Sequence, residues 1–300
     1  PLLQLLSTAE IEDIHDASLI ILEKTGVMIK NSQALQSLKD FGCDVDFDKK
    51  IAHIPQHLVK DCLSKVPSII RLYSRDGKRE LIVGENHTIF NPGSSAVYFS
   101  DHETGEIRQP LSKDLVELVK LVDALKYIQA QSTAMVPSEV PEEIGDLYRL
   151  YLVLKNSTKP IITGAFTKQG LIDMKRLLEV VAGGEDKLAT KPMAIFDAGP
   201  SSPLMWSDTT CQNLIDCAKF NIPAEIIPAP QMGATSPITL AGTLVQFNAE
   251  FLSGMVISQI TKPGAPVIYG GSPTTFDMKY CTSRLGSIEN MMVACASSQV

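Results

Sequence analysis

From residue 112 onwards, short apolar segments alternate with longer amphipathic ones, and this alternation limits the folds open to the chain. We expect strands at 127–135, 160–165, 192–197, 223–228 and 266–270. Helices are expected between them, at 112–125, 142–155, 169–181, 208–220, 240–260 and from 287 to the end. Strands that alternate with helices need crossover connections, which produce a parallel sheet. The pattern therefore predicts an α/β fold.

The ends of the expected strands differ in composition. Lys159-Pro160, Lys191-Pro192 and the run 262–266 precede three strands, and each strand leads into a loop of Gly, Ser, Thr or Pro. Long exit loops of small residues are typical of (β/α)8 barrels of the TIM type, whose chemistry lies at the exit end. A strand at 88–91 brings the total to six, so we predict an incomplete barrel, with its first six βα units in 86–300. An open doubly wound sheet is the alternative, although no G-x-G-x-x-G follows a strand.

The first 85 residues lack this rhythm and are expected to form a mainly helical N-terminal extension. Ser7 and Glu10 are spaced as a capping box before a helix, and further helices are expected at 32–41 and 55–65. A hairpin is expected at 98–108.

Charge and cysteine content restrict the partners and the compartment. The formal charge is −7 with no basic run, which argues against nucleic acid and anionic membrane surfaces as partners. Gln246, Asn248, Glu250 and Gln259 interrupt the most apolar segment, 241–260, so we expect no membrane span. No signal peptide is evident at the start of the sequence. The six cysteines form no C-x-x-C and suggest reduced thiols in a cytoplasmic protein.

The distribution of histidine and lysine excludes several chemistries. All five histidines lie before residue 103, away from the later strand exits where a barrel metallohydrolase needs them, so no metal is expected. The lysines near strands lie at entry ends, which disfavours a Schiff base.

Aromatic and acidic residues at the exits suggest a site for a cationic, methylated amine, because an aromatic face attracts a cation that has lost its water. The candidates are Phe166, Asp197, Trp206, Tyr269, Phe276 and Asp277. Helix capping is the alternative for the acids, and packing inside the barrel or against a helix is the alternative for the rings. A carboxylate-pair hydrolase is a further hypothesis, and it requires Asp197 and Asp277 to face each other at about 5–10 Å.

Four segments carry a family resemblance: 228–242 (PAPQMGATSPITLAG), 248–250 (NAE), 263–270 (PGAPVIYG) and 286–290 (GSIEN). Together they resemble the trimethylamine methyltransferase (MttB-like) family. The resemblance implies a large (β/α) barrel that demethylates methylamines or quaternary amines. It also implies that the methyl group passes to the Co(I) corrinoid of a separate partner protein, with no cofactor bound tightly by this chain.

The resemblance leaves the substrate open. A quaternary amine such as glycine betaine is the leading hypothesis, with Gln131, Gln231, Thr235 and Thr274 available to hold a carboxylate. A pyrrolysine-dependent trimethylamine enzyme is the second, and a non-catalytic barrel that binds quaternary amines is the third. The catalytic position is unknown and is expected on a late barrel strand beyond Val300. Site roles for Glu250 and Glu289 stay open beside surface or capping roles, and a homo-oligomer is expected.

Overall fold

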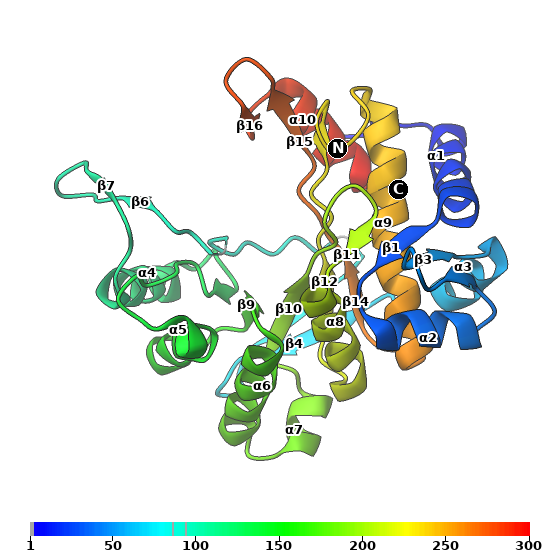
Figure 1. Ribbon diagram of the computed structural model, residues 1–300. Helices are drawn as coiled ribbons and strands as arrows, with labels where there is room; N and C mark the ends of the chain where they lie inside the picture. The colour runs from blue at the N-terminus through cyan, green and yellow to red at the C-terminus, as the bar shows by residue number, and fades with distance from the viewer. Residues whose placement is uncertain (1–2, 86, 94) are drawn as a thin grey trace. The chain divides into compact units, whose positions relative to one another are not determined.

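The computed structural model describes residues 3–85, 87–93 and 95–300, which fall into two compact units (Figure 1). Unit 1 contains Pro1–Val66, Ala198–Lys219 and Glu225–Val300, and unit 2 contains Pro67–Asp197 and Phe220–Ala224. Each unit thus combines segments that lie far apart in the sequence.

Unit 1 is built around a long apolar helix, α9 (Leu240–Thr261). The helix contacts α1 (Thr8–Ile20), α2 (Ser32–Asp40), α3 (Gln56–Leu63) and α10 (Ile288–Ser297) (Figure 1). Its length and composition would suffice to cross a membrane, but 78% of its most apolar window is buried in the structure. A helix that is hydrophobic all round is suited to such an enclosed position.

The N-terminal helices begin where the sequence predicts. The Ser7 hydroxyl accepts from the Glu10 N–H, and the Glu10 carboxylate accepts from the Ser7 N–H, which confirms the capping box of α1. A single π-helical turn, η1 (Ile21–Thr25), extends α1. The α2 helix ends just before Gly42, whose positive φ of 87° suits a chain reversal.

A small sheet accompanies these helices in unit 1. Its order is β11-β1-β3-β2, with bounds Met205–Trp206, Val27–Ile29, Ile51–His53 and Asp44–Asp46. β1 runs antiparallel to β3 and parallel to β11, where Ile29 lies opposite Trp206. The second of these pairings joins the N-terminal segment to the segment that follows residue 198.

Strands from the last third of the chain complete unit 1. β13 (Gln231–Met232) is parallel to β15 (Thr274–Asp277), which forms an antiparallel hairpin with β16 (Thr282–Arg284). β14 (Val267–Tyr269) neighbours β12 (Ala224–Ile226). The β15–β16 hairpin was not expected from the sequence.

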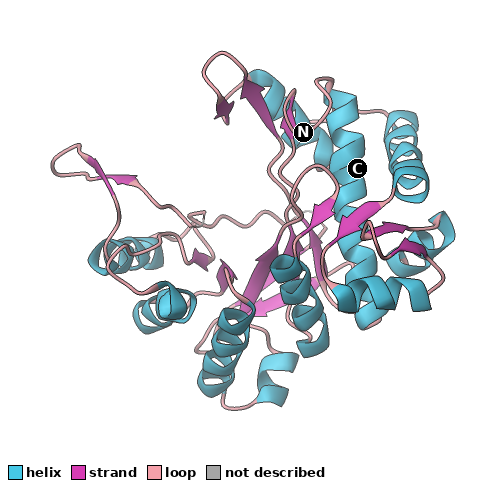
Figure 2. Ribbon diagram, in the orientation of Figure 1, coloured by secondary structure: helices cyan, strands magenta, loops and turns pink. Residues whose placement is uncertain are grey.

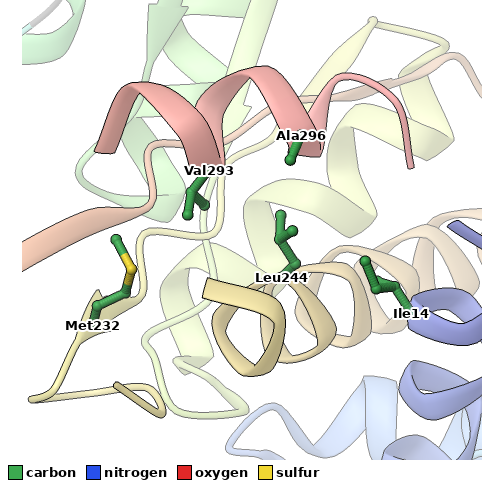
Figure 3. Close-up of a cluster of buried hydrophobic side chains, with 5 residues drawn as sticks. All are labelled: Ile14, Met232, Leu244, Val293 and Ala296. Carbon is green, nitrogen blue, oxygen red and sulfur yellow. The ribbon is translucent and has the colours of Figure 1, made fainter. Parts of the chain in front are cut away.

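An apolar cluster holds α1, α9, α10 and β13 together (Figure 3). Its buried members are Ile14, Met232, Leu244, Val293 and Ala296. In Figure 3, Leu244 lies between the α10 residues and Ile14. Each large aliphatic chain buried here contributes about 1.5–3 kcal/mol relative to exposure, so the cluster fixes the helix α10 that follows the hairpin.

Unit 2 contains three neighbouring parallel strands: β8 (Gln131–Ser132), β9 (Ile161–Gly164) and β10 (Ala194–Ala198), shown in magenta in Figure 2. The helices of this unit are α4 (Ser112–Ala124), α5 (Glu142–Asn156), α6 (Lys168–Ala182) and α7 (Glu185–Thr190). The next helix, α8 (Asp208–Phe220), belongs to unit 1 apart from its last residue. Strands and helices alternate as predicted, and the α/β class with a parallel sheet is confirmed.

Unit 2 also contains two hairpins, β4 (Ile70–Tyr73) with β5 (Glu80–Val83), and β6 (Phe99–Ser100) with β7 (Ile107–Arg108). The second is the hairpin expected at 98–108. An N-terminal domain boundary near residue 85 stays a prediction.

Two local expectations in unit 2 were wrong. Residues 88–91 form no strand, because the single Phe90 carbonyl accepts both the Gln129 and the Ala130 N–H and Pro92 has no N–H to continue a ladder. Ser112 does not cap α4: it is the first helical residue, and the Asp114 carboxylate instead accepts from the Leu111 N–H.

Candidate functional site

A pocket of about 490 Å³ in unit 1 lies beside the β15–β16 hairpin and is called here the hairpin pocket. Two predicted site residues, Phe276 and Asp277, line it. Other lining residues come from β13, from the hairpin and from the start of α10: Met232, Lys279, Arg284 and Glu289. The pocket thus combines an aromatic ring, two carboxylates and two cations at the end of a strand, which makes it the strongest candidate site.

Asp277 and Arg284 form an ion pair across the hairpin, where Asp277 lies opposite Thr282. The second Asp277 oxygen accepts from the backbone N–H groups of Lys279 and Tyr280, which fixes the turn. Partial burial opposes ionisation, but these N–H donors and the Arg284 charge together hold the pKa of Asp277 below its ordinary value. Asp277 is therefore held as an anion, while the Arg284 side chain is 58% exposed to solvent.

Outside the lining of the pocket, α9 carries a fully buried carboxylate at Glu250. The Ser202 hydroxyl donates to it at 2.7 Å, the Leu204 N–H at 3.0 Å and the Gln246 amide at 2.8 Å. Burial raises the pKa of Glu250, and the three donors only partly oppose that rise. The sequence left its role open, although a glutamate inside an apolar helix was itself a signal of a buried polar cluster.

Hydrogen bonds continue from Glu250 to the hairpin. Gln246 also donates to the Thr235 carbonyl at 2.8 Å, and the Thr235 hydroxyl accepts from the Gln231 N–H at 2.9 Å. The Gln231 side-chain amide then donates to the Ser283 hydroxyl at 2.8 Å. Gln231 and Thr235 were both predicted to hold a substrate carboxylate. In the structure these groups form hydrogen bonds within the protein instead.

Three further predicted residues of unit 1 pack inside the protein. Trp206 is fully buried and its indole N–H donates to Ser253 at 2.9 Å. Tyr269 donates to Asn248 at 3.3 Å, and burial raises the pKa of its phenol. Thr274 is buried in β15 beside Gln231. Binding roles for these residues stay predictions.

The remaining predicted residues lie in unit 2. Gln131 is buried and donates to the Val119 carbonyl. The ring of Phe166 is covered on one side by the Arg149 guanidinium, 4.6 Å from the ring centroid. Asp197 lies in β10 opposite Gly164 of β9. Their binding roles also stay predictions.

A second hollow in unit 2, of about 520 Å³, lies between the β6–β7 hairpin and α4. Its central cation, Arg108, contacts the carboxylates of Asp101 and Asp114 at 2.9 and 2.8 Å and the ring of Phe99 at 4.4 Å. These partners satisfy one another, and the hollow contains none of the predicted site residues. Its polar groups are therefore better explained as the support of the hairpin.

Within residues 3–85, 87–93 and 95–300, no three His, Cys, Asp or Glu side chains are grouped so as to hold a metal ion.

Comparison with known proteins places this chain in a family. The family model described as trimethylamine methyltransferase (MTTB) matches residues 1–300. The chain belongs to this family. It is 33% identical over 287 residues to the trimethylamine methyltransferase MttB of Desulfitobacterium hafniense, covering 96% of this chain and 58% of that one.

Two other relatives of the chain differ in their named substrate. The trimethylamine methyltransferase MttB of Methanosarcina barkeri is 31% identical, covering 99% of this chain and 61% of that protein. A glycine betaine methyltransferase from a second D. hafniense strain is 27% identical, with coverage of 100% and 62%. The chain thus spans about three fifths of the length of the relatives it matches.

Solved structures share the fold of this MTTB-family chain. A hydroxylamine complex of MtmB matches with a TM-score of 0.63 at 12% identity, covering 97% of this chain and 58% of that one. The M. barkeri monomethylamine methyltransferase MtmB matches with a TM-score of 0.57, also at 12% identity, with coverage of 97% and 62%. At this identity the likeness concerns the fold alone.

Proposed function

We propose that the protein demethylates a quaternary amine related to glycine betaine and passes the methyl group to the Co(I) corrinoid of a separate partner protein. The observation that carries this proposal is the hairpin pocket, in which Phe276 and Asp277 stand beside the exposed guanidinium of Arg284. Family membership supports methyl transfer from an amine, and two relatives are named for trimethylamine and glycine betaine.

Each half of a betaine has a counterpart in the pocket. The Phe276 ring attracts a quaternary ammonium through cation–π interaction, and the carboxylates of Asp277 and Glu289 add negative charge. Arg284 offers N–H donors in the geometry that a carboxylate accepts. The ligand's carboxylate and ammonium would then be held apart, with the methyl groups directed away from Arg284.

The chemistry asks little more of the chain than binding and orientation. The Co(I) centre supplies the electron pair that forms the bond to the methyl carbon, and the pair of the broken C–N bond leaves with the neutral amine. Because a tertiary amine is a good leaving group, the residues of the pocket need only desolvate the cation and aim one methyl group outwards. The apolar side chains of Met232 and Leu240 line the pocket.

The parallel strands and the likeness to MtmB support a (β/α)8 barrel as the architecture of the whole protein, to which this chain contributes part. A cytoplasmic location, a homo-oligomer and the absence of a tightly bound cofactor belong to the same proposal.

Trimethylamine is the second candidate substrate. It is favoured by the names of the relatives at 31–33% identity, compared with 27% for the glycine betaine enzyme. Trimethylamine carries no carboxylate and needs activation before its methyl group can leave, so it would leave Arg284 without a role in binding.

Product analysis tests the proposal. Glycine betaine with isotope-labelled methyl groups is incubated with the full protein and a reduced corrinoid protein. We expect one labelled methyl group on the corrinoid for each dimethylglycine formed. Labelled trimethylamine that reacts while glycine betaine does not would favour the second candidate, and turnover of neither would contradict the methyltransferase assignment.

A further inference from the structure

Glu250 is the one ionisable residue of the buried, mainly apolar helix α9. Its side chain is enclosed between α9 and the loop at 198–206, and of the described residues that donate to it none carries a positive charge. An ionisable group in such a position costs free energy unless hydrogen bonds replace its water. The presence of Glu250 inside α9 is therefore best explained by the groups that its hydrogen bonds connect.

The contacts of Glu250 connect two loops to one helix. On one side, Ser202 and Leu204 belong to the loop that follows β10. On the other side, Gln246 reaches the carbonyl of Thr235, in the loop between β13 and α9. Both loops are thereby tied to neighbouring turns of α9, a long and largely buried helix of unit 1.

The same connections extend to the hairpin pocket. The loop residue Thr235 holds Gln231 through its hydroxyl, and Gln231 holds Ser283, the residue before Arg284. The β13–β15 register places Gln231 opposite Thr274, two residues before Phe276. Movement of the 231–239 loop would therefore shift both the aromatic and the cationic side of the pocket.

We infer that Glu250 and Gln246 are positioning residues: together they form a brace that sets the geometry of the hairpin pocket without touching the substrate. The expected effect on kinetics rests on the proposed function, whereas the expected effect on the structure of the pocket does not. Side chains that hold a binding site in place through hydrogen bonds are a general requirement of precise sites.

The chain offers a matched pair of variants. Gln246→Leu removes the amide that joins Glu250 to Thr235. Gln259→Leu removes a buried amide from the same helix, where Gln259 binds the Ala265 carbonyl and the Gly264 N–H, away from the pocket. Each variant replaces a buried glutamine of α9 with leucine, so the general loss of stability is matched. The two variants differ in whether the lost hydrogen bonds lead to the hairpin pocket.

Hydrogen exchange of the full protein tests the brace without any assay of activity. We expect Gln246→Leu to speed amide exchange about tenfold or more in 231–239 and 274–284, because the variant loses both hydrogen bonds of the Gln246 amide, to Thr235 and to Glu250. Gln259→Leu should leave those segments unchanged and affect 262–266. Equal rates of amide exchange in 231–239 and 274–284 in the two variants would overturn the inference.

Kinetics with glycine betaine and a reduced corrinoid protein then separate positioning from charge. Gln246→Leu and Glu250→Leu should raise KM about tenfold with a smaller change in kcat, while Glu250→Gln should stay near wild type. The glutamine can still accept from Leu204 and Gln246 and donate to Ser202, so it keeps the brace without the charge. A Glu250→Gln variant as impaired as Glu250→Leu would overturn the positioning role.

The exchange experiment and the kinetic experiment test different claims. Absence of methyl transfer in the wild-type protein would refute the proposed function, while the exchange pattern would still decide whether the brace exists.

Discussion

The side-chain amide of Gln246 lies 2.8 Å from the carboxylate of Glu250, one helical turn further along α9, and donates a hydrogen bond to it. The same amide reaches the Thr235 carbonyl, also at 2.8 Å. A buried helix, two loops and a hairpin are thus joined through side chains that do not line the hairpin pocket. The geometry of the candidate site depends on this polar cluster as much as on the residues that line the pocket.

The first prediction concerns pH and Glu250. Because burial raises its folded pKa above the ordinary value of 4.5, the folded state favours the protonated form. Its contribution to stability is therefore fully present below pH 4.5 and is lost as the pH rises through the folded pKa. Glu250→Gln, which cannot ionise, should escape this loss. Thermal unfolding from pH 4 to 8 should show the Tm of wild type falling relative to that of the variant, and a constant difference would contradict the raised pKa.

A second prediction concerns the aromatic wall of the pocket. Phe276→Leu keeps an apolar side chain but removes the π face, which is worth about 0.5–2 kcal/mol to a bound cation. We expect KM for glycine betaine to rise about 2- to 30-fold by steady-state kinetics. Phe276→Tyr retains a ring and should behave as wild type. An equal effect of both substitutions would show that shape, and not the ring, matters.

The third prediction concerns recognition of a carboxylate. Arg284→Gln should raise KM for glycine betaine about 10- to 150-fold, since hydrogen bonds to charged groups contribute about 1.5–3 kcal/mol. The KM for tetramethylammonium, which has no carboxylate, should not change. Lys279→Gln is the control, because this lysine lines the same pocket but lies over the Tyr280 ring. A parallel rise for both substrates would argue against a carboxylate site at Arg284.

A fourth prediction tests the packing of α9 against the buried indole. A Cβ at Gly254 would lie 2.5 Å from Trp206 Cζ2, and the indole is fully buried. Gly254→Ala should therefore destabilise the protein by about 1–3 kcal/mol, although alanine favours helix. At Gly145 in α5 a Cβ meets nothing within 4 Å, so Gly145→Ala should stabilise by about 0.5–1 kcal/mol. Chemical denaturation measures the free energy of unfolding of both variants. A change of the same sign in both would contradict the close contact between Gly254 and Trp206.

Local patterns predicted most elements of the fold. The predicted 208–220 helix coincides with α8, and the helix expected from residue 287 is α10, which begins at Ile288. These features depend on side chains within a few residues of one another. The β1–β11 pairing of Met28 with Met205, and the hairpin that places Phe276 opposite Ser283, depend on partners brought together by tertiary structure. Such pairings leave little trace in a single sequence.

The candidate site was predicted only in part for the same reason. Phe276 and Asp277 were found from their place after a strand, and both line the pocket. Arg284 was missed because its pairing with Asp277 exists only once the hairpin forms. Gln231 was expected to face a substrate, but its amide is held by Ser283, a contact that no spacing in the sequence reveals.

The most direct measurement follows the visible spectrum of a reduced corrinoid protein in the presence of the full-length enzyme. Glycine betaine, tetramethylammonium and trimethylamine are added in separate reactions. We predict conversion of Co(I) to methyl-Co(III) with glycine betaine, at a lower KM than with tetramethylammonium because only the former engages Arg284. No conversion with either quaternary amine, under conditions where a known methyltransferase methylates its own corrinoid protein, would contradict the account.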